Sequence, residues 1–262
     1  MTDELQRFRL DGQVAIVGGG SGGIGVRTCA ALAGVGAEVA IVGRAAAGLE
    51  EARAGVEKSG RSALVIAADM TTREQADQAV DQTMDAFGRV DVVVNAIGGG
   101  AGTALYPAEL YPDSEWQRIL DLNLATALHL SQSAAQAMIA AERGGSILNI
   151  SSVRGQLGID AGYSAYVAAK GALDALTRQH ATEWAKHRIR VNAISPTFVR
   201  TAQAASLLAD QSFYESLISR IPLRRIADTD DLVGAILFFC SAAAAFVTGQ
   251  ILTVDGGLTA TQ

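Results

Sequence analysis

The chain has 262 residues, of which 49% are hydrophobic, 18% are charged and 28 are glycine, and its formal net charge at pH 7 is −6. A chain of this length and apolar content buries a large core, which excludes disorder throughout. The acidic balance, without a run of basic residues, excludes the electrostatic footprint of a nucleic-acid-binding protein.

Neither the cysteines nor the histidines are spaced as a redox pair or as metal ligands. Cys29 and Cys240 lie far apart in apolar surroundings, which predicts two buried thiols in a reducing compartment. His129, His180 and His187 lack metal-ligand spacing and cysteine partners, so no metal is expected.

Two segments bear on localisation. Met1–Leu10 is charged and does not resemble a secretory signal. Leu232–Val247, the most apolar window, is shorter than the roughly 20 residues of a membrane span and predicts a buried helix. We therefore expect a cytoplasmic protein with no membrane or nucleic-acid partner.

Short β-branched segments alternate with longer helical patterns along the whole chain. The clearest helix spans Thr72–Phe87, where apolar residues recur at i, i+3 and i+4 spacing. The alternation predicts one α/β domain over residues 1–262, a Rossmann fold with a doubly wound, seven-stranded parallel sheet. Ligands of such sheets bind at the carboxyl ends of the strands. The expected strands, apolar on both faces, are Val14–Val17, Val39–Val42, Leu64–Ala67, Val92–Val94, Ser146–Ile150, Arg190–Ile194 and Ile251–Val254.

A glycine-rich loop, Gly18–Gly25, follows the first expected strand and precedes a helical pattern that starts at Val26. Tight turns alone recruit glycine, but glycines between a strand and a helix also let the backbone approach a pyrophosphate. No Gly-Lys-Ser/Thr sequence follows, which disfavours a nucleoside-triphosphate P-loop. The loop predicts a dinucleotide site. Its expected contacts are Gly19, Ser21, Gly22, Gly23, Ile24 and Gly25.

The second expected strand ends at Val42-Gly43-Arg44, without the acidic residue that would bind the adenosine ribose hydroxyls of NAD. Arg44 is either an ordinary solvated residue or a ligand of the 2′-phosphate of NADP. The missing acid favours the second interpretation, so NADP(H) is expected to be preferred, with NAD(H) as the alternative. Asp69, after the third strand, either caps the next helix or receives the adenine amino group.

Tyr166 and Lys170 lie four residues apart in a helical stretch that runs to about Trp184. This spacing puts the phenol and the ammonium on one helix face, where the cation would lower the pKa of the phenol. Such a pair is usually only a solvated helix face. Tyr163 provides an internal comparison, because the residue four positions on is Val167.

Over nearly its whole length the chain resembles a single-domain short-chain dehydrogenase/reductase. The family's Thr-Gly-x-x-x-Gly-x-Gly loop matches Gly18–Gly25, with Gly18 in the threonine position. The family's Asn-Asn-Ala-Gly motif corresponds to Asn95–Gly98, and its Pro-Gly motif reads Pro196-Thr197. Phe246–Gln250 and Val254–Gly257 also fit the family pattern.

The resemblance implies a catalytic set of Asn123, Ser152, Tyr166 and Lys170. Hydride would pass between nicotinamide C4 and a secondary alcohol or ketone carbon, while Tyr166 exchanges the proton and Ser152 holds the substrate oxygen. Lys170 would lower the pKa of Tyr166 and bind the nicotinamide ribose, and Asn123 would hold a water. Ser151 is a weaker candidate than Ser152, because the family's serine directly precedes a Val-x-Gly pattern. The expected cofactor contacts beyond the glycine loop are Arg44, Asp69, Met70, Asn95, Gly98, Tyr166, Lys170, Pro196, Val199 and Thr201.

The sequence is less informative about the substrate than about the cofactor. Arg200–Pro222 would form a mobile lid over the substrate. Motifs near Phe8, Leu207 and Ile221 resemble the gluconate 5-dehydrogenase-like branch, which overlaps with reductases of 3-oxoacyl carriers and hydroxysteroids. The expected substrate is thus a sugar acid, a 3-oxoacyl thioester or a hydroxysteroid. A sugar acid needs a cation, for which Arg154 and Arg200 are candidates.

A non-catalytic nicotinamide-nucleotide sensor or scaffold is the alternative function, although a pure binder needs no catalytic set. The resemblance also implies a homotetramer, or at least a dimer. Its contacts would come from the helices that carry Asn123 and Tyr166 and from Leu232–Val247 and Ile251–Val254.

Overall fold

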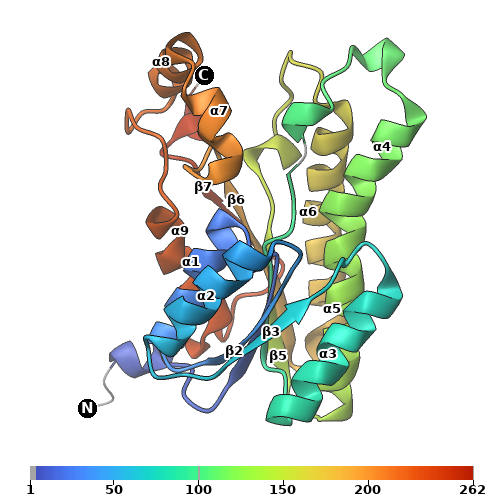
Figure 1. The fold of residues 1–262 in the computed structure, drawn as a ribbon, viewed down its shortest axis with the longest axis vertical. Helices are drawn as coiled ribbons and strands as arrows, with labels where there is room; N and C mark the ends of the chain where they lie inside the picture. Colours follow the sequence, from blue (N-terminus) through green and yellow to red (C-terminus); the bar gives the residue numbers. More distant parts are fainter. Residues whose placement is uncertain (1–3, 100, 262) are drawn as a thin grey trace.

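A single parallel sheet organises the fold. In the computed structural model, which describes residues 4–99 and 101–261, seven strands lie in the order β3-β2-β1-β4-β5-β6-β7 (Figure 1). The doubly wound, seven-stranded sheet expected from the sequence is confirmed, and every expected strand is present. The strands are β1 (Val14–Gly18), β2 (Glu38–Gly43), β3 (Ala63–Ala67), β4 (Val92–Asn95), β5 (Gly145–Ile150), β6 (Ile189–Pro196) and β7 (Ile251–Val254).

Helices cover both faces of the sheet, because the apolar strands need partners on either side. One face carries α1 (Gly23–Gly34), α2 (Ala46–Glu57) and α9 (Asp230–Cys240). The other face carries α3 (Arg73–Phe87), α5 (Thr126–Ala140) and α6 (Ser164–Trp184). Helix α4 (Asp113–Leu120) leads into α5 through a π-helical turn, Asp121–Ala125.

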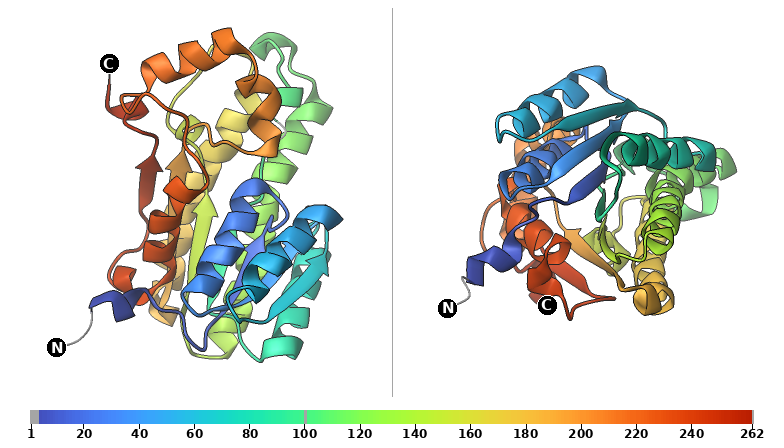
Figure 2. Two further views of the ribbon diagram at one scale, coloured as in Figure 1. Left: turned by 60° about the vertical axis from the view of Figure 1, so that its left-hand side comes forward. Right: turned by 90° about the horizontal axis from the view of Figure 1, so that it is seen from below.

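Two short helices, α7 (Ala205–Leu208) and α8 (Gln211–Arg220), lie beyond the carboxyl ends of the strands (Figure 2). They belong to the segment expected to form the lid. Leu217, Ile221 and Ile226 form a small buried cluster of their own there, separate from the two clusters that flank the sheet.

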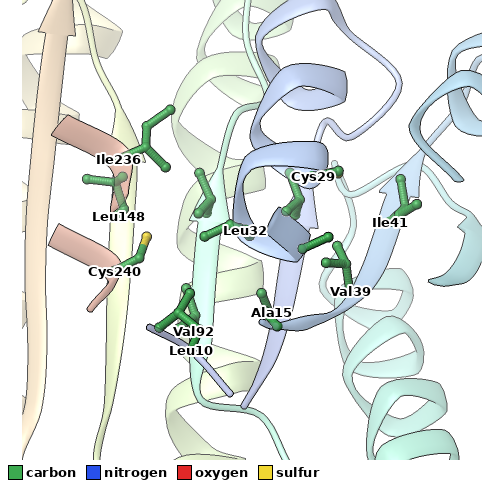
Figure 3. Packing of buried hydrophobic residues seen from close by; sticks show 14 of the residues in the cluster. Leu10, Ala15, Cys29, Leu32, Val39, Ile41, Val92, Leu148, Ile236 and Cys240 are labelled. Carbon is green, nitrogen blue, oxygen red and sulfur yellow. The ribbon is translucent and has the colours of Figure 1, made fainter. Parts of the chain in front are cut away.

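Side chains alternate between the two faces of each strand, as strand geometry requires. In β1, Ala15 and Val17 belong to the cluster under α1 and α9, whereas Ile16 belongs to the cluster under α3 and α5. Figure 3 shows the first cluster, to which α1 contributes Cys29 and α9 contributes Cys240. Both cysteines are buried and free, as expected, and burial raises the pKa of both thiols to about 12.

Two segments that were expected to be buried are partly exposed in the structure. The helix predicted over Leu232–Val247 ends at Cys240, because Ser241 adopts an extended conformation and its hydroxyl accepts a hydrogen bond from the backbone N–H of Ala243. Phe246 is consequently fully exposed, at 105%. The strands are also not all buried on both faces. Val65 of the edge strand β3 is 38% exposed.

Candidate active site

The glycine loop joins β1 to α1, and α1 starts at Gly23, three residues before the expected start. Gly22 is the N-cap residue and provides no side-chain cap, and the first turn contains no acidic residue. The first backbone N–H groups of a helix lack intrahelical partners and attract anions. This uncapped end, with Gly22 and Gly23 exposed, therefore fits a pyrophosphate group.

Close packing explains the glycines in the loop. A Cβ atom on Gly25 would overlap the carbonyl oxygen of Gly19, and a Cβ on Gly19 would lie 2.6 Å from the carbonyl oxygen of Ala96. A Cβ on Gly23 would lie 2.9 Å from Cγ2 of Thr201, which places Thr201 over the start of α1. Gly23 and Thr201, two expected cofactor residues that are far apart in the sequence, are thus neighbours.

The end of β2 packs against the same loop. A Cβ on Gly43 would lie 2.5 Å from Oγ of Ser21, so a larger residue at position 43 would require Ser21 to move. The exposed Arg44 guanidinium lies 3.2 Å from a carboxylate oxygen of Asp69. Thr72 rather than Asp69 caps α3, because its hydroxyl accepts a hydrogen bond from the Gln75 N–H. The helix-capping alternative for Asp69 is therefore wrong.

Other expected cofactor residues lie at strand ends with their side chains directed inward. Asn95 is 1% exposed, and its Nδ2 donates to Ser131 Oγ and Asn149 Oδ1, which ties β4 to α5 and β5. Met70 is buried in the core beneath α3 and α5. Pro196 ends β6, and the buried Val199 forms a bridge with Ala227.

Lys170 lies at the centre of the expected catalytic set, with 2% exposure. Its Nζ donates a hydrogen bond to the Ile150 carbonyl oxygen at 3.0 Å and lies 5.7 Å from the centroid of the Tyr166 ring. A Cβ on Gly98 would lie 3.1 Å from this Nζ and 3.0 Å from Asn123 Oδ1, so these three residues meet. Burial lowers the pKa of Lys170 to about 8, against the opposing charge of Asp174.

Ser152 follows β5 by two residues and lies close enough to Tyr166 to act on its phenol. Burial raises the pKa of Tyr166, while the Ser152 hydrogen bond and the charge of Arg154 act in the opposite direction. In the protein without its cofactor, burial is the largest influence on this pKa. The lowering of the Tyr166 pKa by Lys170 stays a prediction for the cofactor-bound protein.

Asn123 lies in the π-helical turn and is fully buried. Its Nδ2 donates to the carbonyl oxygens of Gly99 and Ile119, each at 3.0 Å, and its Oδ1 accepts from the Gly99 N–H at 2.9 Å. Asn123 therefore holds the backbone that follows β4 beside Lys170.

Two side chains near the set were not predicted as a pair. Ser151 Oγ donates to Asp174 Oδ1 at 2.5 Å, and both residues are buried. The sequence contains a signal for this contact, since Asp174 lies four residues after Lys170 on the same helix face.

The cationic candidates differ in their partners. Arg200 pairs with Asp228 at 3.2 Å in an exposed ion pair. Arg154 is half-buried, and its Nη1 donates to the Gly158 carbonyl oxygen at 3.0 Å. Among the described residues no carboxylate pairs with Arg154, whose pKa is lowered by burial and by the charge of Arg220.

A cavity of about 680 Å³ opens next to the set, between residues 105–109 and 158–164. Tyr163 lines this cavity, and its ring centroid lies 6.4 Å from that of Tyr166. Tyr163 thus faces a different environment from Tyr166, and within the described part of the chain no lysine lies over its ring.

Comparison with known proteins decides the family. A family model described as enoyl-(acyl carrier protein) reductase matches residues 19–259. The chain belongs to the short-chain dehydrogenase/reductase family. Within this family it is 35% identical to a gluconate 5-dehydrogenase of Gluconobacter oxydans over 96% of both chains. It is also 35% identical to a tropinone reductase homolog of Arabidopsis thaliana, covering 97% of this chain and 95% of that one.

A solved family structure agrees with the fold. The gluconate 5-dehydrogenase of Burkholderia cenocepacia, in complex with NADP and tartrate, superposes with a TM-score of 0.91 at 32% identity, covering 98% of this chain and 99% of that one. As a family member, the protein is a nicotinamide-dependent oxidoreductase that acts on CH–OH groups. Over the described part of the chain, the helices are too short or too polar to span a bilayer, and the same residues contain no cluster of metal-ligating side chains.

Proposed function

We propose that the protein interconverts a secondary alcohol and a ketone with Tyr166 as the general acid and base. The observation that carries the proposal is the meeting of Ser152, Tyr166 and Lys170 beyond the end of β5, where Lys170 Nζ lies 5.7 Å from the centroid of the Tyr166 ring and Ser152 acts on the phenol. When bound, the nicotinamide cofactor supplies or accepts the hydride.

The chain's own residues handle the oxygen and its proton. Tyr166 gives its phenolic proton to the carbonyl oxygen during reduction and removes the alcohol proton during oxidation. Ser152 donates a hydrogen bond to the same oxygen and holds it beside Tyr166. Lys170 places a positive charge near the phenol, and Asn123 holds Gly99 and the adjoining backbone in place.

We propose NADP(H) as the preferred cofactor. Gly43 replaces the acid that would bind the ribose hydroxyls of NAD, and Arg44 follows it on the surface. The glycine loop from Gly19 to Gly25 would hold the pyrophosphate at the uncapped start of α1. Thr201 and Gly98 lie where they would border the nicotinamide half, next to Gly23 and Lys170 respectively.

We propose a polyol or keto acid that carries a carboxylate as the substrate. Arg154 supports this choice, because it is a half-buried cation without a carboxylate partner among the described residues, and its charge acts on Tyr166. The related proteins named gluconate 5-dehydrogenase agree with such a substrate. The segment 200–222, with its separate small core, would close over this substrate.

A Tyr166→Phe variant tests the proposal and separates it from the sensor alternative. We expect kcat to fall by roughly 10²–10⁴, because general acid–base catalysis contributes about that factor. NADPH binding, measured by fluorescence, should persist because only a hydroxyl is removed. Tyr163→Phe is the matched control and should stay active. An active Tyr166→Phe enzyme, or an inactive Tyr163→Phe enzyme, would overturn the assignment.

A further inference from the structure

Asp174 is a buried carboxyl group that the proposed reaction does not use. It is 4% exposed on α6, one turn after Lys170. Tyr166, Lys170 and Asp174 occupy positions i, i+4 and i+8, so they form one stripe along the helix.

This stripe faces three consecutive residues at the end of β5. Lys170 Nζ donates to the Ile150 carbonyl, Ser151 Oγ donates to Asp174, and Ser152 lies close enough to Tyr166 to act on its phenol. Each of these three residues therefore faces a different turn of α6. The bond between Ser151 and Asp174 contains no expected catalytic residue.

Asp174 also contacts the far side of the turn that carries Ser152. A Cβ on Gly155 would lie 2.6 Å from Asp174 Oδ2, so the Gly155 backbone lies directly on the carboxylate. Within the turn, the Gly155 N–H donates to the Ser152 carbonyl at 2.8 Å, and the Arg154 N–H donates to Ser152 Oγ at 3.2 Å. Ser151 and Gly155, which lie on either side of Ser152, thus both contact the Asp174 carboxylate.

We propose that Asp174 is a positioning residue, which holds Ser151 and Gly155 so that the Ser152 hydroxyl stays in line with Tyr166, and whose negative charge keeps Lys170 protonated. The proposal rests on the proposed roles of Ser152, Tyr166 and Lys170. A Ser152 hydroxyl that shifts by about 1 Å would cost up to a hundredfold in rate.

The charges around the stripe give the direction of the pH effect. Burial lowers the pKa of Lys170 to about 8, and the charge of Asp174 opposes this shift. Burial raises the pKa of Asp174 itself, against the Ser151 hydrogen bond and the charges of Arg178 and Lys170. Tyr163 and Arg154 act on the Tyr166 phenol from the neighbouring turn and loop. Without the Asp174 charge, Lys170 would lose its proton at a lower pH.

Three variants separate positioning from charge. Asp174→Asn keeps an oxygen for the Ser151 hydrogen bond but removes the charge, so the alkaline limb of the kcat–pH profile should move to lower pH by roughly one unit. Ser151→Ala keeps the charge but removes the tie, so kcat should fall roughly tenfold with the KM for NADPH unchanged. Asp174→Ala should show both effects.

Asp77→Asn is the matched control, since Asp77 accepts a hydrogen bond from Ser133 between α3 and α5, away from this stripe. It should change neither kcat nor the pH profile. Thermal unfolding and NADPH binding establish that each variant is folded. If Asp174→Ala does not fold, Ser151→Ala and Asp174→Asn still decide the question.

An unshifted pH profile in Asp174→Asn, together with an unchanged kcat in Ser151→Ala, would overturn the proposal. A general loss of stability without these kinetic changes would leave Asp174 with a structural role only, which also overturns it. Failure of the proposed function has a different signature, because Tyr166→Phe would then remain active.

Discussion

At the residue scale, Arg44 already has a partner in Asp69, and a 2′-phosphate must compete with that carboxylate. The ion pair is exposed, with 64% and 40% of the two side chains accessible, so it contributes about 0–1 kcal/mol. A hydrogen bond to a charged phosphate contributes about 1.5–3 kcal/mol. The phosphate should therefore displace Asp69.

We accordingly expect kcat/KM to favour NADPH over NADH by roughly tenfold to a hundredfold, with Arg44→Ala removing most of this preference. Arg53→Ala is the control, because Arg53 lies on α2 and pairs with Glu50. Steady-state kinetics with both cofactors provide the ratio. A wild-type ratio below one, or one that Arg44→Ala leaves unchanged, contradicts the proposed role.

A separate prediction concerns the role of Arg154 in binding the substrate carboxylate. Arg154→Gln should raise the KM for gluconate roughly tenfold or more while hardly changing the KM for glucitol, which has no carboxylate, because a charged hydrogen bond contributes about 1.5–3 kcal/mol. Arg200→Gln removes a guanidinium that already pairs with Asp228 and should affect neither substrate. Equal changes with both substrates would show that Arg154 does not bind a carboxylate.

The residue scale also shows what a sequence can and cannot predict about this site. Tyr166 and Lys170 are predictable because their spacing alone puts them on one helix face. The raised pKa of Tyr166 is not, because it results from burial by segments distant in sequence. The hydrogen bonds between Asn123 and Gly99 were not predictable either, because they depend on a π-helical turn that no sequence pattern indicated.

At the element scale, α1 contains two glycines that should respond oppositely to the same substitution. Gly25→Ala places a Cβ on the carbonyl oxygen of Gly19 and should open the loop, with loss of NADPH binding. Gly34→Ala, at the other end of α1, meets no atom within 4 Å and should stabilise the helix by about 0.5–1 kcal/mol. Thermal unfolding and NADPH titration of both variants test this. Tight NADPH binding by Gly25→Ala would contradict the packing argument.

Elements were predictable from the sequence where one local signal dominated. The periodicity of α3 and the β-branched runs locate these elements closely, and Thr72 caps α3 where its pattern begins. The C-terminal apolar window failed as a prediction, because hydrophobicity alone does not reveal that Ser241 leaves the helix. Phe246 is apolar and yet fully exposed, so the prediction of burial from the apolar composition of this window is wrong at that residue.

At the scale of the whole molecule, both edges of the sheet expose an apolar side chain, Val65 at 38% on β3 and Leu252 at 43% on β7. The β7 edge differs in that Phe246, at 105%, precedes the strand by five residues. Exposed apolar edges commonly mark contacts with another chain. We expect a homotetramer, or at least a dimer, with this edge in an interface.

Light scattering at micromolar concentration tests the assembly. The double variant Phe246→Asp/Leu252→Asp should form smaller species than the wild type, because two charges would be buried in the contact. Val65→Asp on the opposite edge strand, β3, should leave the assembly unchanged. A monomeric wild type would refute the expectation.

The contact between Gly43 and Ser21 constrains how this enzyme could change its cofactor during evolution. An aspartate at position 43 would provide the missing ribose ligand, but its Cβ would lie 2.5 Å from the serine hydroxyl oxygen. Gly43→Asp alone should therefore distort the loop and bind neither nucleotide well. Ser21→Gly would remove that oxygen, but Ser21 is itself an expected cofactor contact, so this step should weaken nucleotide binding until Gly43→Asp restores a ribose ligand. The route to an NAD enzyme therefore involves Ser21 as well as Gly43.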